Sequence, residues 1–278
     1  MTGYPDRASR GQTKAEIDAL LAKYGLAPRH ALGQHFLADP NIVERIVRTA
    51  GVNEGDRVVE IGAGTGTLTR LLAATGAQVV AYELDEGLGR LLSEVLEGMD
   101  VDVRFANALD LDFASELDGV GWHLVANLPY NVGTPLVLDV LQRHPTIGKL
   151  TVMLQSEVVD RLLATPGTSR YGVPSIVTAL HARVVATFTV PPDVFVPPPA
   201  VDSAVVVLER IEADQWAPDA IMLAKAAFGQ RRKMLRRSLT SVFDDPSVFL
   251  EASGIDPTRR AETVTPQEYL RLAEVVGT

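Results

Sequence analysis

The sequence predicts an α/β protein: a large domain built on a mostly parallel β-sheet, followed by a small helical domain. Between residues 57 and 164, short β-branched runs alternate with segments of helical length. Such alternation is typical of βαβ units, in which helices cover both faces of a parallel sheet. After Ile211 the segments are helical in character and none is convincing as a strand. We therefore expect the large domain to span residues 1–211 and the small domain residues 212–278.

Two helices are expected before the alternation begins. Apolar residues at helical spacing predict a helix over Thr13–Tyr24, and Gly25 is a typical helix stop. Residues 25–38 are loop-like. Asp39 is followed by a proline, a pair typical of an N-cap and a first helical turn, and this predicts a second helix that runs to about Ala50.

Within the alternating region, the β-branched runs predict strands over Arg57–Ile61, Gln78–Glu83, Val101–Ala106, Trp122–Ala126 and Lys149–Leu154. The segments that follow them predict helices over Thr67–Ala74, Glu86–Leu96, Pro135–Gln142 and Glu157–Ala164. A late strand is expected over Val201–Glu209, after the proline cluster Pro197–Pro199.

Composition excludes several classes of protein. The chain has 278 residues, 46% of them hydrophobic, and no cysteine, so disulfides, cysteine-based zinc sites, iron–sulfur clusters and a cysteine nucleophile are excluded. The five histidines are scattered without the spacing of metal ligands, and no metal is expected. No apolar run approaches the ~18–20 residues of a membrane span, and the N-terminus lacks the apolar core of a secretion signal. We therefore expect a cytoplasmic protein that does not bind membranes.

The strongest local feature is a glycine-rich turn between a predicted strand and a predicted helix. Residues 58–66 read V-V-E-I-G-A-G-T-G, so that Gly62, Gly64 and Gly66 have the spacing G-x-G-x-G after an acidic residue. Glycine permits positive φ and lets a ligand approach the backbone closely. The spacing departs from the G-x-G-x-x-G fingerprint of sites that hold a pyrophosphate. It resembles the S-adenosylmethionine site of class I methyltransferases, which have a Rossmann-like domain and whose ligand has no phosphate.

Two residues at the ends of later strands favour a nucleoside cofactor. Glu83 ends the strand after the turn, about 20 residues beyond Gly62, where acidic side chains accept hydrogen bonds from ribose hydroxyls. Asn107 follows the third strand, where an amide carbonyl can accept from an adenine amino group. A plain turn residue is the alternative for Asn107.

The tetrapeptide Asn127-Leu128-Pro129-Tyr130 follows the fourth strand. In class I methyltransferases this loop lies beside the transferable methyl group, and motifs of the Asn/Asp-Pro-Pro-Tyr type are typical of enzymes that methylate an exocyclic amine. The lone pair of such an amine is delocalised into the ring, so the nitrogen is a poor nucleophile. An Asn side chain and a backbone carbonyl could accept both amino protons and align the nitrogen, while Tyr130 offers a flat face to the base. Catalysis would then rest on proximity and alignment. The alternative is a buried strand end with a proline turn.

Further motifs extend over most of the chain: Gly33–Leu37, Tyr171-Gly172, Phe195–Ala204, Ala227–Lys233 and Gly254–Pro257. Together with the glycine-rich turn and the tetrapeptide, they closely resemble the bacterial small-subunit ribosomal RNA adenine dimethyltransferases, the kasugamycin-sensitivity methyltransferase family. The resemblance covers roughly residues 25–275, and the motifs keep their order and spacing.

The resemblance implies a role for each matching position. The segment Gln34–Leu37, with His35 and Leu37, would close over S-adenosyl-L-methionine. The glycine turn would contact the methionine part of this cofactor, Glu83 its ribose, Asn107 its adenine and Asn127 its methyl-bearing region. Phe195 would stack on the target adenine opposite Tyr130. The implied product is a pair of adjacent N6,N6-dimethyladenosines near the 3′ end of 16S rRNA in the small ribosomal subunit precursor, and a monomer is expected.

Three positions depart from the pattern of this family. His35 stands where the family usually has Asn, Asn107 replaces the usual Asp, and Ser156 replaces a common Lys. The first two affect details of cofactor contact, and the third removes a possible RNA contact. None of them lies in Asn127–Tyr130, so the same activity is expected.

Charge is unevenly distributed in this acidic chain, which has 26 Lys and Arg against 35 Asp and Glu. A basic stretch opens the predicted small domain, with Arg231, Arg232, Lys233, Arg236 and Arg237. Residues 1–36 are also basic on balance. We expect these side chains to contact RNA phosphates, which position an enzyme without reading sequence. Discrimination would come from RNA shape and from flipping an unpaired base.

Alternative functions remain open at this level. One is a resistance-type methyltransferase that acts on large-subunit RNA, although its small domain should lack the segment Phe228–Lys233. Another is a ribosome assembly factor, or a transcription factor of the mitochondrial kind, that has lost turnover; intact Asn127 and Tyr130 argue against it. A small-molecule amine methyltransferase is the remaining alternative, if the basic segments do not bind RNA.

Overall fold

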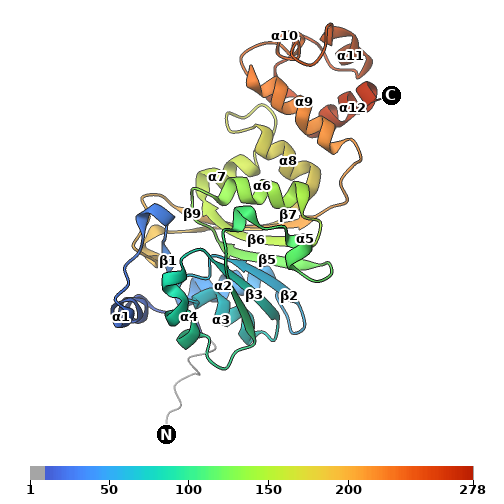
Figure 1. Ribbon diagram of the computed structural model, residues 1–278. Coiled ribbons are helices and arrows are strands. Elements are labelled where there is room, and N and C mark those ends of the chain that lie inside the picture. The colour runs from blue at the N-terminus through green and yellow to red at the C-terminus, as the bar shows by residue number, and fades with distance from the viewer. Residues whose placement is uncertain (1–9, 278) are drawn as a thin grey trace. The chain divides into compact units, whose positions relative to one another are not determined.

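The computed structural model describes residues 10–277 and divides into two compact units (Figure 1). The first comprises Met1–Ser156 and Val184–Glu209, and the second comprises Glu157–Arg183 and Arg210–Thr278. The chain crosses between the units three times, and the predicted boundary at residue 211 lies close to the third crossing, between Glu209 and Arg210. A division at that point alone is nevertheless wrong for residues 157–183, which belong to the second unit. The tertiary contacts of this segment, such as the hydrogen bond from the Tyr171 hydroxyl to the carbonyl of Val264, leave no periodic signal in the sequence.

A seven-stranded mixed sheet forms the centre of the first unit, with strand order β4-β3-β2-β5-β6-β9-β7. The strands are β2 (Arg57–Ile61), β3 (Gln78–Glu83), β4 (Val101–Phe105), β5 (Trp122–Asn127), β6 (Ile147–Gln155), β7 (Ala182–Val190) and β9 (Ser203–Arg210). The strands β4, β3, β2, β5 and β6 run parallel to their neighbours, and β9 is antiparallel to β6. The carboxyl ends of β2, β3 and β5 therefore meet at one edge of the sheet.

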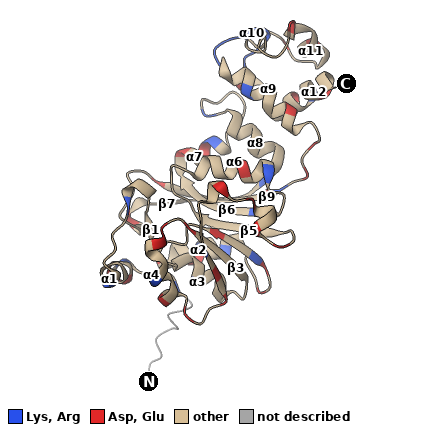
Figure 2. Ribbon diagram, viewed as in Figure 1, with Lys and Arg blue, Asp and Glu red and all other residues tan. Residues whose placement is uncertain are grey.

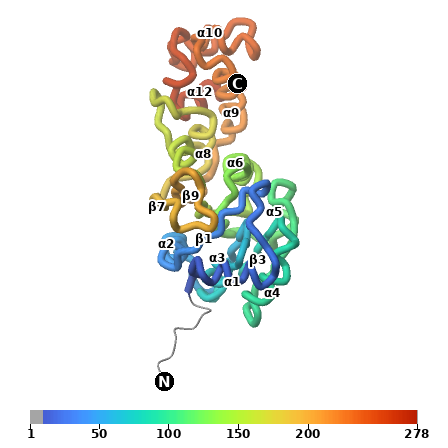
Figure 3. Tube along the Cα trace, turned by 90° about the vertical axis from the view of Figure 1, so that its left-hand side faces the viewer, coloured from blue at the N-terminus to red at the C-terminus, as the bar shows by residue number. Residues whose placement is uncertain are grey.

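The helices of the first unit are α1 (Lys14–Tyr24), α2 (Pro40–Ala50), α3 (Thr67–Ala74), α4 (Gly89–Val95), α5 (Phe113–Glu116) and α6 (Gly133–Arg143). The helix α2 begins at the predicted cap, because Asp39 accepts from the amides of Asn41 and Ile42. Thr13, which the sequence placed inside the first helix, is instead its N-cap and accepts from the amide of Glu16. Figure 3 shows α2 and α5 on opposite sides of the sheet. The sheet is thus covered on both faces, as the alternating pattern predicted.

The apolar core of the first unit forms between the sheet and these helices. Ile46 of α2 and Leu72 of α3 pack in one cluster with Val58, Val79 and Val125 of the sheet. On the other face, the ring of Tyr82 meets that of Phe113 in α5 edge to face. Alternate residues of each strand therefore supply the two faces.

A second, two-stranded sheet joins distant parts of the first unit. β1 (Phe36–Leu37) pairs antiparallel with β8 (Phe195–Val196), which fixes the segment before α2 against the segment before β9. The sequence predicted that residues 25–38 are loop-like. The structure shows that they also contain β1 and a short 3₁₀ turn over His30–Leu32.

The second unit is helical. Its helices are α7 (Ser156–Leu162), α8 (Val173–His181), α9 (Ala217–Gly229), α10 (Leu235–Ser238), α11 (Pro246–Ala252) and α12 (Pro266–Gly277). Between residues 212 and 277 the structure has no strand, only a single bridge between Met234 and Arg260. The helix α8 and the strand β7 were not predicted. None of the helices in residues 10–277 is both long and apolar enough to cross a bilayer.

Candidate active site

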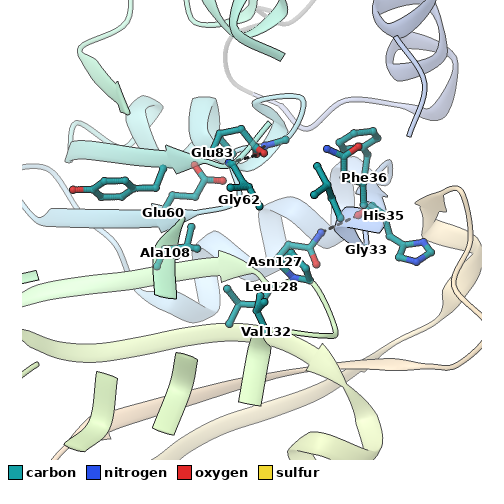
Figure 4. A pocket seen from close by; sticks show the side chains of 18 of the residues that line it. Gly33, His35, Phe36, Glu60, Gly62, Glu83, Ala108, Asn127, Leu128 and Val132 are labelled. Atoms are coloured by element: carbon teal, nitrogen blue, oxygen red, sulfur yellow. Dashed lines mark hydrogen bonds between the residues drawn. The ribbon is translucent and has the colours of Figure 1, made fainter. Parts of the chain in front are cut away.

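A pocket opens at the carboxyl ends of β2, β3 and β5, and the segment 31–37 forms one of its walls (Figure 4). It lies entirely within the first unit. Among its lining residues are all those that the sequence predicted for the cofactor and for the tetrapeptide: His35, Leu37, Gly62, Gly64, Glu83, Asn107, Asn127, Leu128, Pro129 and Tyr130. The structure thus brings together positions that are spread over almost one hundred residues.

The glycine-rich turn after β2 has the conformation that its glycines permit. Gly62, Gly64 and Gly66 have φ of 82°, 55° and 76°, in the left-handed region that disfavours other residues. A Cβ on Gly64 would lie 3.2 Å from the Phe36 ring. Substitution of this glycine would therefore both strain the backbone and press on the wall formed by β1.

Glu83, at the end of β3, is held by the backbone of this pocket. One carboxylate oxygen accepts from the amide of Gly64 at 2.8 Å, and the other accepts from the amides of Leu84 and Asp85, each at 2.9 Å. Its side chain is 6% exposed, and this burial raises the pKa of Glu83. The carboxylate is thus fixed with remaining acceptor capacity, as a ribose hydroxyl would require.

Glu60 is a pocket residue that sequence reasoning did not assign to the site. It precedes the glycine-rich turn, is 1% exposed, and its Oε2 atom has no hydrogen-bond partner among the described residues. Burial, with a smaller effect from the charge of Glu83, raises the pKa of Glu60 to about 8. The only sequence signal was the acidic residue ahead of the turn.

Asn107 is a turn residue that also lies at the pocket, while its contact with adenine stays a prediction. Its Oδ1 accepts from the amide of Leu109 at 3.2 Å and its Nδ2 donates to Asp110 at 2.9 Å, so that it caps a 3₁₀ turn over Ala108–Asp110. It also lines the pocket beside Ala106 and Ala108. The turn fixes the amide, and the carbonyl oxygen retains one lone pair that faces no other described residue.

Asn127 is oriented by the opposite wall of the pocket. Its Nδ2 donates to the backbone carbonyl of His35 at 3.1 Å, as the dashed line in Figure 4 shows. No described residue donates to its Oδ1, which remains an acceptor. Leu128 is 1% exposed and anchors the tetrapeptide in the core, and the Pro129 carbonyl accepts from the amides of Val132 and Gly133 at 3.2 and 3.0 Å.

Tyr130 and His35 form one stacked pair at the pocket. Their ring centroids are 5.6 Å apart with an angle of 26° between the planes. The Tyr130 hydroxyl shares a hydrogen bond with Ser203, and Nδ1 of His35 donates to the carbonyl of Pro197 at 2.7 Å. The His35 ring is therefore engaged with Tyr130 and Pro197, and its backbone carbonyl is the group that reaches Asn127.

The structure does not place Phe195 where the sequence interpretation put it. Phe195 is 2% exposed, belongs to the core cluster with Leu37, Val190 and Val205, and does not line the pocket. Its pairing with Leu37 in the two-stranded sheet directs the ring into the core. In this conformation Phe195 therefore does not face the pocket, and its stacking on the target adenine opposite Tyr130 stays a prediction.

The segment predicted to close over the cofactor is fastened to the far side of the pocket. The Gln34 side chain donates to Asp85 at 3.1 Å and accepts from the amide of Arg29 at 2.8 Å. The Arg29 guanidinium forms an ion pair with Asp85 at 3.0 Å. The amide of Asp85 also donates to Glu83. Asp85 therefore contacts both the segment Gln34–Leu37 and the carboxylate that is expected to bind ribose.

The predicted RNA-binding residues lie in the second unit, on the segment that joins α9 to α10 and in α10 itself (Figure 2). Arg231 is engaged internally: its Nε donates to Glu262 at 2.8 Å, and a terminal nitrogen donates to the carbonyl of Ser169. The other four side chains are exposed: Arg232, Lys233, Arg236 and Arg237. Arg260, which the sequence interpretation missed, is also exposed and lies beside them through the bridge between Met234 and Arg260.

The basic N-terminal stretch differs from this segment. Arg7 lies outside the described residues. Arg10 forms an ion pair with Glu16, Lys23 with Glu94, and Arg29 with Asp85. The cations of this stretch are therefore largely neutralised within the first unit.

The pocket fits S-adenosylmethionine. A turn of glycines with positive φ admits close approach to the backbone, and Glu83 presents a fixed carboxylate for ribose. Glu60 adds a second carboxyl group to the pocket, and its Oε2 has no partner among the described residues. Within residues 10–277 no group of three or more acidic or histidine side chains could hold a metal ion. A sheet of this order, with this turn after β2 and an acidic residue ending β3, defines a class I S-adenosylmethionine-dependent methyltransferase.

The chain belongs to the ribosomal RNA adenine dimethylase family, whose family model matches residues 26–277. It is 43% identical, over 95% of its length and 93% of the relative's, to Ribosomal RNA small subunit methyltransferase A of Phenylobacterium zucineum. A dimethyladenosine transferase from Plasmodium falciparum has the same fold, with a TM-score of 0.70 and 24% identity over 86% of this chain and 96% of that one. The 23S rRNA methyltransferase ErmE aligns with a TM-score of 0.66 and 26% identity, over 87% of this chain and 100% of that one.

Proposed function

We propose that this enzyme transfers methyl groups from S-adenosylmethionine to the N6 amines of two adjacent adenosines near the 3′ end of 16S rRNA, in an assembling small ribosomal subunit. The product is a pair of N6,N6-dimethyladenosines. We also propose that it acts as a cytoplasmic monomer. The observation that carries the amine chemistry is the hydrogen bond from Asn127 to the carbonyl of His35. The family and the name of its 43% identical relative support the ribosomal substrate.

The residues of the pocket account for reaction at a weakly nucleophilic amine. Because one N–H of Nδ2 is donated to the His35 carbonyl, the amide of Asn127 is held with Nδ2 toward that wall. Its Oδ1 is then available to accept an amino proton of adenine. That hydrogen bond turns the nitrogen lone pair out of conjugation and toward the cofactor, which supplies an electrophilic methyl group when bound. Tyr130 offers an aromatic surface beside the amine. The proton leaves after transfer, so alignment supplies most of the acceleration.

The same geometry allows a second methyl transfer to the same amine but no third. After one methylation the amine keeps one N–H, which Asn127 can still accept. After two, no N–H remains, and the amide oxygen loses its partner in the product. The lost hydrogen bond favours release of the dimethylated base.

RNA recognition is assigned to the exposed cations of the second unit: Arg232, Lys233, Arg236, Arg237 and Arg260. We call these residues the basic surface. The first unit contains 13 basic and 23 acidic residues, and the second contains 13 basic and 12 acidic ones. Attraction to phosphate is therefore concentrated in the second unit, and within it on the basic surface.

A large-subunit substrate is the second candidate, because ErmE aligns over the whole of its chain. In the test, the enzyme is incubated with labelled S-adenosylmethionine and, separately, immature small subunits, large subunits or free RNA. Transfer by Asn127→Ala gives the background. We expect label in 16S rRNA of immature small subunits, with N6,N6-dimethyladenosine in the nuclease digest. Label confined to 23S rRNA would instead assign the large-subunit activity. No transfer to any RNA above the background would overturn the proposal.

A further inference from the structure

Residues 11–13, just before α1, lie against the glycine-rich turn. We call them the N-terminal stretch. Gln12 is 1% exposed, and its side chain forms two hydrogen bonds to Thr65: Nε2 donates to the Thr65 carbonyl at 2.9 Å, and Oε1 accepts from the Thr65 hydroxyl at 2.6 Å. The backbone amide of Gln12 donates to the Thr67 hydroxyl at 2.8 Å. Gln12 therefore makes two hydrogen bonds to the turn and one to the first residue of α3, across more than fifty residues of sequence.

The neighbours of Gln12 hold it in this position. A Cβ on Gly11 would lie 2.7 Å from the Cα of Pro40, so that only glycine permits this approach to the start of α2. Thr13 caps α1, and the Glu16 side chain returns to the Thr13 amide at 2.8 Å. Burial opposes ionisation of Glu16, but hydrogen bonds from Thr13 and Arg10 outweigh it and lower the pKa of Glu16 to about 2. The stretch is thus fixed on both sides of Gln12.

Thr65 is the point at which this contact reaches the cofactor pocket. It lies between Gly64 and Gly66, both at positive φ, and it lines the pocket while Gln12 does not. Glycines carry a large conformational entropy, so a turn of three glycines needs fixed partners to keep one shape. Gly64 is held by Glu83 on the pocket side. Gln12, which does not line the pocket, holds the adjacent residue Thr65.

We propose that Gln12 is a positioning residue for cofactor binding: by fixing Thr65 it holds the glycine-rich turn in its binding conformation, and it couples docking of the N-terminal stretch to affinity for S-adenosylmethionine. Gln12 acts only through the turn. Its loss therefore weakens binding of the cofactor and leaves the transfer step intact once the cofactor is bound.

The test measures binding of S-adenosylmethionine to the full-length enzyme by calorimetry, and steady-state methyl transfer to immature small subunits. Gln12→Ala removes both side-chain hydrogen bonds. We expect the Kd and the KM for S-adenosylmethionine to rise about tenfold, the effect of roughly one net hydrogen bond, with kcat at saturation changed less than about twofold. Lys14→Ala, an exposed neighbour of this stretch, is the matched control and keeps the wild-type Kd.

A second variant separates positioning from a general effect on folding. Thr65→Val keeps the shape of the side chain and removes the hydroxyl that donates to Gln12. We expect it to weaken cofactor binding as well, and the double variant to be no weaker than the worse of the two single variants, because both remove the same contact. A folded Gln12→Ala enzyme with unchanged Kd, or a double variant with fully additive effects, overturns the proposal. A lower Tm with an unchanged KM does so too.

Discussion

Asn127 and His35, ninety-two residues apart in the chain, are joined by a hydrogen bond of 3.1 Å from the side-chain amide of one to the backbone carbonyl of the other. The bond decides which end of the amide faces the substrate. An Asn side chain offers two donors and one acceptor, and here the donor end is engaged by the wall that contains β1. The pocket therefore presents an acceptor to an incoming amine, which is the polarity that amine methylation requires.

Replacement of Asn127 by alanine should strongly reduce turnover and only modestly weaken cofactor binding. The lost contact aligns the amine at the moment of transfer, and one such contact is worth ~2–4 kcal/mol by analogy with oxyanion-hole donors. The expected loss in kcat is therefore roughly thirty- to one thousand-fold. Single-turnover methyl transfer measures it, and calorimetry measures the cofactor Kd.

The matched control for this amide truncation is Gln142→Ala. Gln142 is exposed on α6, and among the described residues its amide donates only to the carbonyl of Leu138 in the same helix. It should retain the wild-type rate. A wild-type rate in Asn127→Ala would contradict the assigned role.

Replacement of Glu83 by glutamine should weaken cofactor binding about tenfold or more. Both carboxylate oxygens accept backbone amides, so the NH₂ of a glutamine must face either Gly64 or the amides of Leu84 and Asp85. The charged hydrogen bond to ribose is also lost, at roughly 1.5–3 kcal/mol, and each ~1.4 kcal/mol is a factor of ten in Kd. Calorimetry checks this against Glu86→Gln, an exposed neighbour. Equal affinities in the two variants would place the ribose elsewhere.

Local sequence signals predicted the elements that form the pocket. The bounds of β2, α3 and β3 are those expected from the sequence, because each element is bounded by residues that act locally, such as Gly62 and Gly66. Glu83 and Asn127 could be identified for the same reason: each ends a strand, and the ends of parallel strands meet at one edge of a sheet.

Long-range pairing could not be predicted in this way. The strands β1 and β8 are two residues each, too short to show an alternating pattern, yet their pairing buries Phe195 and brings the carbonyl of His35 to Asn127. Similarly, Arg260 reaches the basic surface only through its bridge to Met234. Gln12 is a polar residue with no motif around it, and its burial depends on the approach of Gly11 to Pro40.

Stability should depend on pH through Glu60. Burial raises the pKa of Glu60 to about 8 from 4.5. Between these values the folded state holds a proton that the unfolded state has released, so the free energy of unfolding falls as pH rises, by up to about 1.4 kcal/mol per pH unit. Glu60→Gln should remove this slope. Denaturant unfolding of the cofactor-free enzyme between pH 5 and pH 8 measures it.

The difference in the free energy of unfolding between Glu60→Gln and wild type should change with pH in one direction. Glu60→Gln should gain stability relative to wild type toward pH 8, and the gain should shrink toward pH 5, where both side chains are neutral. Glu54→Gln, at an exposed position before β2, should keep the wild-type pH slope. Parallel curves for wild type and Glu60→Gln would mean that Glu60 is ionised in the folded enzyme throughout this range.

Binding to the ribosomal particle should depend on salt through the basic surface. Each phosphate that a cation neutralises releases counterions, so log K should fall with log salt at a slope of about 0.7–0.9 per contact. Arg231 is excluded from this count because it is engaged with Glu262. Replacing Arg232, Lys233 and Arg236 by glutamine should therefore weaken binding to immature small subunits and flatten the slope by about two units. Filter binding at several salt concentrations measures both.

The control for that triple variant removes three positive charges outside the basic surface. It changes three exposed residues to glutamine: Arg48, Lys225 and Arg271. If the effect comes from local phosphate contacts, this control keeps nearly the full slope, since net charge alone acts weakly at physiological salt. Adding Arg260→Gln to the first triple variant should flatten the slope further, because Arg260 lies beside the same segment. Cofactor affinity should stay unchanged in every variant, because the pocket lies in the first unit. Equal slopes in wild type and in the first triple variant would show that these cations face solvent in the complex.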